Sequence, residues 1–193
     1  TNCHLNAGIQ PFAMSLIGVD KRFPQYRGRE DVLGSLKDRI NGCFERSMNG
    51  KKLKNNSDEM KALVSYINWL GRYVNKGEIV NGKGLKSIKY PNRKVNLVKG
   101  KEVFDRVCVE CHGNDGQGEK IDNYTYLYPP LWGNNSYNNG AGMTRVLTAA
   151  MFIKYNMPQG TTFDLPSLTD EEAYDVAGYI NQQSRPKKMS LQE

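Results

Sequence analysis

Histidine is scarce in this sequence, which contains only His4 and His112, together with four cysteines. Long apolar runs are missing as well, since no segment approaches the roughly 18 consecutive apolar residues that cross a membrane. The N-terminus shows no hydrophobic stretch of the kind found in secretion signals, so we expect a mature or trimmed chain. These absences predict a protein without a membrane span.

Apolar material is also limited for a chain of this length. Hydrophobic residues make up 38% of the 193 residues and charged residues 24%. Such a chain is long enough for one large domain or two small ones. Two small domains of this polarity would have thin cores unless a large apolar group filled them.

Basic residues outnumber acidic ones, and the formal net charge is +7. This excess suits an anionic substrate or an acidic partner. The basic run Lys51–Lys52–Leu53–Lys54 is interpreted as a solvated surface, so we expect no nucleic-acid partner.

Each histidine directly follows a cysteine, and one of these pairs completes a C-x-x-C-H motif. Residues 108–112 read Cys-Val-Glu-Cys-His, the signature of covalent haem c attachment. The two cysteines can form thioethers with the vinyl groups of one porphyrin, and the histidine then binds the iron as the proximal ligand. A thiol redox pair or half of a zinc site is the alternative, but zinc needs about four ligands and no others lie nearby. Cys108, Cys111 and His112 are therefore predicted to hold a haem c.

The N-terminus carries the end of a second motif of this kind. Cys3 and His4 match its last two positions, and a cysteine directly before Thr1 would complete it. We expect the sequence to begin one residue inside a second attachment site, with Cys3 as a thioether and His4 as the proximal ligand. A stray Cys–His pair at a chain end is the alternative.

A weak internal repeat supports two haem domains. Tyr66–Ile67–Asn68 recurs as Tyr179–Ile180–Asn181, and each copy lies on a predicted helix. One helix begins at Ser57–Asp58–Glu59 and the other at the capping box Thr169-x-x-Glu172. Each helix has an apolar face that predicts burial: Met60, Leu63, Ile67 and Leu70 in one, and Ala173, Val176, Ala177 and Ile180 in the other.

The segment from Asn75 to Leu97 is rich in Gly, Lys and Asn and lacks a clear period, which indicates a linker. A further helix, with Val103, Phe104 and Val107 on one face, leads into Cys108. The sequence thus predicts a mainly α fold with two cytochrome c-type haem domains in tandem, at residues 1–75 and 98–193, joined by a linker at 76–97.

The sixth ligands of the two irons can be sought among the soft sulfur side chains. For the second haem we favour Met157, which stands in an extended loop before Pro158, over Met143 and Met151. For the first haem, the repeat points to Met48. Cys43 is the alternative, because the attachment motifs do not use it and an unpaired thiol is a liability in an oxidising compartment.

Five blocks of the sequence resemble a known family. They are residues 1–8 (Thr-Asn-Cys-His-Leu-Asn-Ala-Gly), 23–27 (Phe-Pro-Gln-Tyr-Arg), 38–50 (Asp-Arg-Ile-Asn-Gly-Cys-Phe-Glu-Arg-Ser-Met-Asn-Gly), 128–133 (Tyr-Pro-Pro-Leu-Trp-Gly) and 156–158 (Asn-Met-Pro). Through them most of the chain resembles the di-haem thiosulfate dehydrogenases, and the third block is the most specific.

The resemblance implies two covalently attached haem c groups with different roles. The first, held by His4 and Cys43, would be catalytic, and the second, held by His112 and Met157, would pass electrons on. Arg29, Arg39 and Ser47 would line the substrate site, although both arginines could instead pair with haem propionates. Pro130 and Trp132, in the block at residues 128–133, would contact the second haem. Asn156 replaces a lysine of some family members that can compete with methionine for the iron.

The implied reaction joins two thiosulfate ions into tetrathionate with release of two electrons, or runs in reverse. Cys43 would be a ligand and, by hypothesis, a nucleophile that carries a sulfur adduct. The expected partners are thiosulfate or tetrathionate and a soluble or membrane-attached electron-transfer cytochrome, and the expected location is the periplasm. A di-haem electron carrier without its own substrate and a sulfur-transfer cytochrome are the alternatives.

Overall fold

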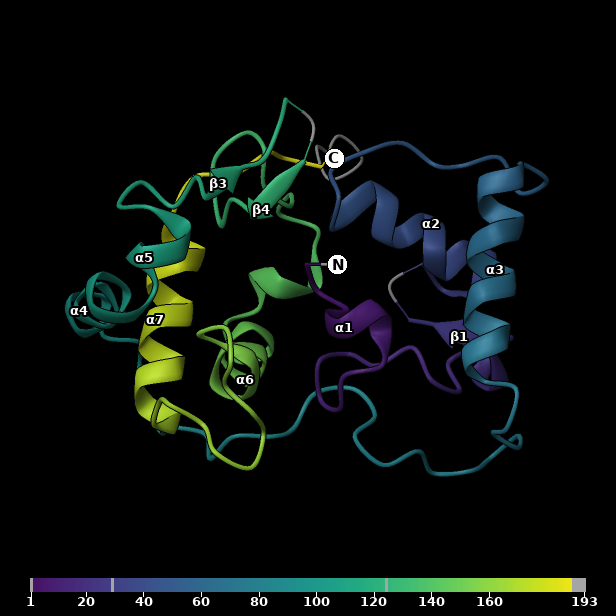
Figure 1. Cartoon of the computed structure of the whole chain (residues 1–193), viewed down its shortest axis with the longest axis horizontal. Helices are drawn as coiled ribbons and strands as arrows, with labels where there is room; N and C mark the ends of the chain where they lie inside the picture. Colours follow the sequence, from purple (N-terminus) through teal and green to yellow (C-terminus); the bar gives the residue numbers. More distant parts are fainter. Residues whose placement is uncertain (1, 29, 124, 189–193) are drawn as a thin grey trace. The chain divides into compact units, whose positions relative to one another are not determined.

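The computed structural model describes residues 2–28, 30–123 and 125–188, and helices are its main regular elements (Figure 1). The described residues divide into two compact units. One contains most of residues 3–45 and 50–84. The other contains Asn2, residues 46–49 and the residues from Leu85 onward. The mainly α fold predicted from the sequence is confirmed.

The first unit is built around two long helices. Its elements, in chain order, are α1 (Leu5–Gly8), η1 (Asp20–Arg22), β1 (Gln25–Arg27), β2 (Val32–Gly34), α2 (Leu36–Arg46, whose last residue is grouped with the other unit) and α3 (Asp58–Leu70). The short strands form an antiparallel hairpin in which Tyr26 pairs with Leu33.

Helix α3 forms where its capping residues and apolar spacing predicted it. The Ser57 side chain accepts a hydrogen bond from the Met60 N–H at 3.3 Å, which satisfies one of the unpaired N–H groups of the first turn. Met60 and Ile67 are buried and pack with Val19 and Ile40 in the core of this unit. The predicted buried face of this helix is therefore confirmed.

The second unit is richer in helix. Its elements are α4 (Leu97–Val107), α5 (Val109–His112), β3 (Glu119–Lys120), β4 (Tyr126–Tyr128), η2 (Gly142–Thr144), α6 (Val146–Asn156) and α7 (Asp170–Gln182). Strands β3 and β4 pair in antiparallel fashion. The capping box of α7 is present, because Thr169 Oγ1 accepts from the Glu172 N–H and the Glu172 carboxylate accepts from the Thr169 N–H.

Helices α4 and α7 cross closely and enclose the core of the second unit (Figure 1). Gly100 allows this approach, since a Cβ at this position would collide with the backbone of Asp175. The ring of Phe104 packs against those of Trp132 and Tyr179, with centroid distances of 5.1 and 5.5 Å. The core residues are Val103, Phe104, Leu168, Val176 and Ile180.

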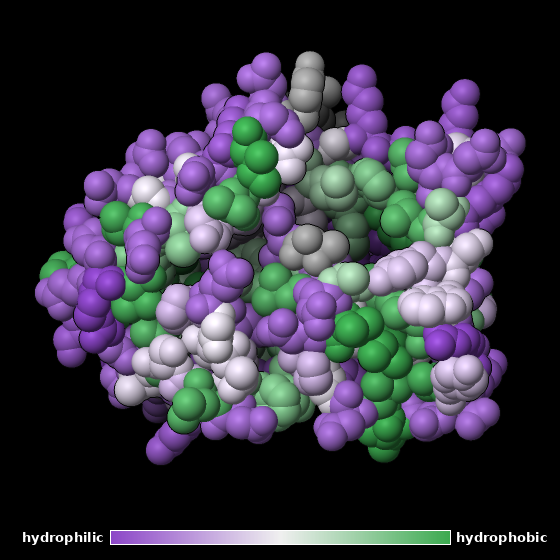
Figure 2. All heavy atoms as spheres, viewed as in Figure 1, coloured by the Kyte–Doolittle hydropathy of each residue, from purple (hydrophilic) through white to green (hydrophobic). Residues whose placement is uncertain are grey.

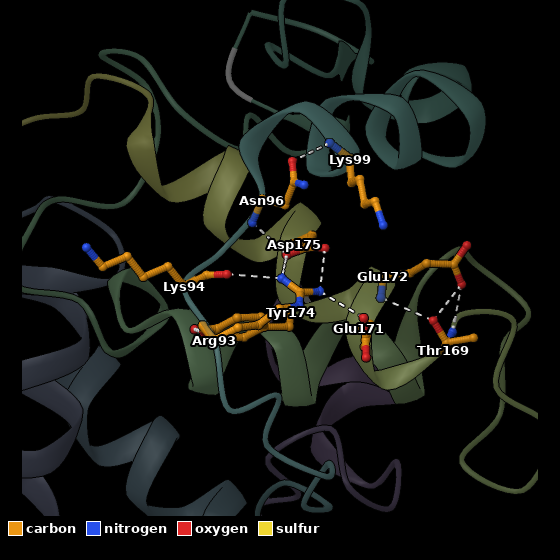
Figure 3. A network of polar contacts seen from close by, with 9 residues as sticks. All are labelled: Arg93, Lys94, Asn96, Lys99, Thr169, Glu171, Glu172, Tyr174 and Asp175. Atoms are coloured by element: carbon orange, nitrogen blue, oxygen red, sulfur yellow. Dashed lines mark hydrogen bonds and ion pairs between the residues drawn. The ribbon is translucent and has the colours of Figure 1, made fainter.

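A polar network fixes the segment before α4 to the start of α7 (Figure 3). Both carboxylate oxygens of the buried Asp175 accept hydrogen bonds from the Arg93 guanidinium, at 2.7 and 2.8 Å. Asp175 also accepts from the Asn96 N–H at 2.8 Å, and Arg93 forms an ion pair with Glu171. The carboxylate is thus compensated by a fork of two charged donors and a backbone donor.

Polar side chains cover most of the face shown in Figure 2, with smaller apolar patches between them. Among the described residues, none of the helices has the length and apolar character needed to cross a membrane.

Candidate functional site

The C-x-x-C-H motif of the second unit forms one helical turn. The His112 and Cys111 N–H groups donate to the Cys108 carbonyl at 2.9 and 3.2 Å, so both cysteines lie on the same short turn. Gly113 ends this turn with a φ of +73°, a conformation that glycine adopts without strain.

The His112 ring is oriented by a backbone carbonyl. Its Nδ1 lies 2.9 Å from the Pro129 oxygen, and because a carbonyl only accepts, Nδ1 must carry the proton. This leaves the lone pair of Nε2 for a metal, which is the usual arrangement of metal-binding histidines. Burial lowers the pKa of His112, partly opposed by this hydrogen bond, and so favours the neutral ring that can bind iron.

The first thiol of this motif, that of Cys108, is poorly suited to redox chemistry of its own. Burial, with a smaller contribution from Cys111, raises the pKa of Cys108 to about 12. A thiol with so high a pKa forms little of the thiolate that attacks disulfides. The alternative of a dithiol redox pair is therefore disfavoured.

The segment with the predicted haem contacts Pro130 and Trp132 wraps around this motif. Pro130 is buried next to the Pro129 carbonyl that holds His112. The Trp132 ring packs on Phe104, and a Cβ at Gly116 would collide with it. Both residues therefore belong to a segment in contact with the motif or its helix, and their contact with the haem stays a prediction.

Met157, the predicted sixth ligand, directly follows α6. Its N–H donates to the Ile153 carbonyl at 2.9 Å, and its own backbone is extended, with φ −130° and ψ 146°. Its side chain is half-buried, as are those of the rivals Met143 and Met151. The preceding Asn156 is buried, and its amide donates to the Phe152 carbonyl at 3.0 Å. The choice of Met157 stays a prediction.

The first unit repeats the arrangement of the proximal histidine. His4 Nδ1 lies 2.7 Å from the Met14 carbonyl oxygen, so here too Nδ1 carries the proton and Nε2 keeps its lone pair. The adjacent Cys3 is half-buried. Burial raises its pKa, and the neighbouring Cys43 adds to the shift.

Cys43 lies on α2 one turn after Arg39, and the two side chains are in contact. Arg39 Nη1 donates to Cys43 Sγ at 3.1 Å. Cys43 is half-buried and belongs to the same unit as Cys3 and His4. Met48 is 63% exposed and belongs to the short segment grouped with the other unit. The arrangement favours Cys43 over Met48 as the sulfur ligand of the first iron, which stays a prediction.

The remaining predicted site residues are not all brought together. Arg29 lies outside the described residues. Ser47 is half-buried in the turn after α2, within the segment 46–49. A second guanidinium near Arg39 was missed: the pKa of Arg22 is lowered by burial and then by the charge of Arg39. No sequence signal marks Arg22, because the fold of η1 brings it near Arg39.

Both units thus fit a covalently attached haem. Each offers a histidine whose Nδ1 proton is fixed by a backbone carbonyl, directly after a half-buried cysteine. Each unit also has an apolar core cluster, and Cys108 and Val109 pack against that of the second unit.

Comparison with protein families agrees with this division. A model described as "SoxA/TsdA, cytochrome c domain" matches residues 1–74, and one described as "Cytochrome c" matches residues 97–184. The predicted tandem of two cytochrome c domains is confirmed.

Several curated thiosulfate dehydrogenases are similar to this chain. That of Psychrobacter arcticus is 42% identical over 97% of this chain and 56% of its own length. Those of Stutzerimonas stutzeri and Allochromatium vinosum are 39% and 42% identical, over 100% and 93% of this chain and 62% and 65% of their own lengths. The chain therefore spans about three fifths of each of these relatives.

A solved structure has the same fold. The thiosulfate dehydrogenase (TsdBA) from Marichromatium purpuratum, in its "as isolated" form, superposes with a TM-score of 0.89 at 38% identity, over 96% of this chain and 40% of that one. With Cys108, Cys111 and His112 forming one attachment motif, Cys3 and His4 matching the end of another, and a cytochrome c domain matched in each part of the chain, this protein is a di-haem c-type cytochrome that is similar to the thiosulfate dehydrogenases and carries two covalently attached haem c groups.

Proposed function

We propose that this protein is a thiosulfate dehydrogenase, which joins two thiosulfate ions through a new sulfur–sulfur bond into tetrathionate. Each thiosulfate gives up one electron, so two electrons leave for an acceptor, and the reverse reaction consumes two. The haem irons supply the one-electron acceptors when bound. The observation that carries the proposal is the contact between Arg39 and Cys43 in the unit that also contains His4.

The guanidinium groups of the first unit would offset the repulsion between the two substrate anions. Two thiosulfate dianions repel each other, and a planar guanidinium binds their sulfonate oxygens with a fork of donors. Arg39 is exposed on α2, and the pKa of Arg22 is lowered by burial and then by the charge of Arg39. We include Arg29 and Ser47 in the proposed substrate site from the family resemblance.

Cys43 and His4 are proposed as the residues that would bind the first haem iron. A thiolate favours the ferric state and matches the soft sulfur chemistry of the substrate. Arg39, as a donor to its sulfur, stabilises the thiolate form. His112 and Met157 are proposed as the ligands of the second iron, which passes electrons to a cytochrome-type acceptor in the periplasm.

The test is thiosulfate-dependent reduction of a ferric cytochrome by the holoprotein. We expect Cys43→Ala to lower kcat at least a hundredfold while both haems stay attached, and the matched variant Met48→Ala to retain activity. Electron spin resonance of the ferric protein should show a thiolate-ligated centre that disappears only in Cys43→Ala. Loss of activity in Met48→Ala with retention in Cys43→Ala would falsify the ligand assignment. Absence of any reduction by thiosulfate in the unaltered protein would leave an electron carrier.

A further inference from the structure

The stretch at residues 85–96 belongs to the second unit and is attached to it at several points. Ile88 and Val95 pack against the apolar cluster formed by residues of α6 and α7. The Lys89 N–H donates to the Asp170 carboxylate at 2.9 Å. This stretch is therefore a fixed support against which other segments of the unit can be held.

Lys86 connects this stretch to the loop that follows Met157. Its Nζ donates to the Phe163 carbonyl at 3.1 Å. The same Nζ lies 4.9 Å from the centroid of the Tyr155 ring and 5.4 Å from that of the Phe163 ring, distances at which an ammonium group is attracted to an aromatic ring. The Lys86 side chain is half-buried, so its contacts are screened less than those of a fully exposed lysine.

The next residue, Ser87, connects the same stretch to α6. The hydroxyl of the buried Tyr155 donates to the Ser87 carbonyl at 2.9 Å. Tyr155 precedes Met157 by two residues, and Phe163 follows Met157 by six. Residues 86 and 87 therefore hold the chain on both sides of Met157.

The loop after Met157 also has hydrogen bonds of its own. The Thr161 N–H donates to the Pro158 carbonyl at 3.0 Å, and Thr161 Oγ1 lies 2.9 Å from Ser167 Oγ. Bonds of this kind fix the shape of the loop. Its place beside α6 depends in addition on the bond from Lys86, which comes from outside the loop.

We propose that Lys86 is a positioning residue for Met157: together with Ser87 it holds the ligand loop in place and so keeps the Met157 thioether on the iron of the second haem. The inference rests on Met157 as a ligand of that iron, which is part of the proposed function. Loops open locally at a free-energy cost set by the contacts that must break. A weaker hold on the loop should therefore give an external ligand easier access to the iron.

Imidazole binding to the ferric holoprotein tests the proposal, because imidazole replaces a methionine on ferric haem without any transfer of electrons. Loss of the weak long-wavelength absorption band of methionine-ligated ferric haem follows the exchange. We expect Lys86→Met, which keeps an apolar side chain but removes the ammonium group, to raise the affinity for imidazole about tenfold, since a hydrogen bond from a charged donor is lost. Lys86→Arg, which retains a charged donor, should stay within twofold of the unaltered protein. So should Lys94→Met, which removes a charge from an exposed position of the same stretch.

A second variant tests the hold on α6 at constant packing. Tyr155→Phe keeps the aromatic ring and removes only the hydroxyl that donates to the Ser87 carbonyl. We expect it to raise the affinity for imidazole about threefold, since a neutral hydrogen bond is lost. This variant gives the answer even where Lys86→Met does not fold.

Unchanged imidazole affinity in the folded Lys86→Met and Tyr155→Phe proteins would overturn the proposal and leave Met157 as the ligand. An equal rise in Lys94→Met would contradict it as well, because net charge would then explain the effect. A long-wavelength band that survives in Met157→Ala would show that another residue binds the iron, and would overturn both this inference and the proposed ligand.

Discussion

Arg39 and Cys43 are the two side chains on which the proposed chemistry depends most directly. The two residues are one helical turn apart, and the Arg39 guanidinium donates a charge-assisted hydrogen bond to Cys43 Sγ at 3.1 Å. Because Arg39 is exposed, water screens part of its interaction with the sulfur and with an anionic substrate. We therefore expect Arg39 to contribute moderately to substrate binding, which should persist in its absence.

Replacing Arg39 should accordingly weaken substrate binding without destroying the site. We expect Arg39→Gln to raise KM for thiosulfate about tenfold, which corresponds to about 1.4 kcal/mol. Lys37→Gln removes a positive charge from the same helix, where Lys37 contacts the Asn55 carbonyl, and should leave KM within twofold. Steady-state kinetics over a range of thiosulfate concentrations measures both. A similar rise in both variants would mean that Arg39 acts only through net charge.

Asp175 is the residue through which acid should destabilise the second unit. Burial disfavours its charged form, but hydrogen bonds from Arg93 and the Asn96 N–H outweigh this, so its pKa lies below the ordinary value. A carboxyl with a lowered folded-state pKa contributes stability that is complete above its unfolded pKa of about 3.9 and is lost as pH falls further. The pKa values of Asp170 and Glu172 are lowered as well and act in the same direction.

Asp175→Asn should therefore lower stability at pH 7 and flatten the acid dependence below about pH 4. We expect a fall in melting temperature at pH 7 of roughly 5 °C, since hydrogen bonds to a charged group are lost. The exposed Asp105→Asn, which breaks an ion pair with Lys101, should have a much smaller effect. Thermal unfolding between pH 3 and pH 7 measures the difference, and parallel pH curves for the unaltered protein and Asp175→Asn would contradict the assignment.

At the residue scale, the features that could be predicted from the sequence are those that depend only on residues close together along the chain. The motif of Cys108, Cys111 and His112 is readable because its chemistry requires fixed spacing within one turn. The influence of Arg39 on Arg22 and the carbonyl partners of His4 and His112 could not be read, because folding alone brings them together.

Among the elements, the crossing of α4 and α7 depends most on a single position. Gly100 lies inside a helix, where replacement by alanine normally stabilises by about 0.5–1 kcal/mol. Here the added methyl would meet the backbone of Asp175, so the helices would have to move apart.

We therefore expect Gly100→Ala to destabilise the protein by about 2 kcal/mol, within the range for an overpacked core. Glu102→Ala, at an exposed position of the same helix, should be nearly neutral. Denaturant unfolding with the Trp132 environment as the probe measures both variants. A stabilised Gly100→Ala protein would show that α4 and α7 do not approach as closely as described.

Helices with caps and a regular apolar period were predictable, and the short strands were not. Both α3 and α7 combine an N-cap with a clear apolar face, and both formed as expected. The hairpin of β1 and β2 has only three residues per strand, and most of them are exposed, so no alternation marks it. Positive φ angles at Asn6 and Ala7 also leave no pattern in the sequence.

For the whole molecule, the cores are small relative to the chain. The main core cluster of the second unit has five buried residues and that of the first has four, within the described part of the chain. Small cores supply little stability by themselves. A covalently attached haem buries a large apolar surface and should therefore contribute much of the folding free energy.

Preventing haem attachment in one unit should reveal this dependence. We expect the double variant Cys108→Ser and Cys111→Ser to lose amide protection in α4 and α7 while α3 keeps its protection. Hydrogen exchange read by mass spectrometry resolves the two units, and Met143→Leu, which leaves the attachment motif intact, serves as the control. Full protection of α7 in the double variant would show that the protein part is stable on its own.

Both imidazole rings are held by oxygen atoms of the main chain, one from Met14 and one from Pro129. A main-chain acceptor survives a change of the side chain attached to the same residue. A substitution at position 14 or 129 can therefore change the size and shape of that side chain while the proton of the histidine ring stays on Nδ1. The path of the backbone thus selects the histidine tautomer that can bind iron. This tautomer should therefore persist when the residue that supplies the carbonyl is substituted.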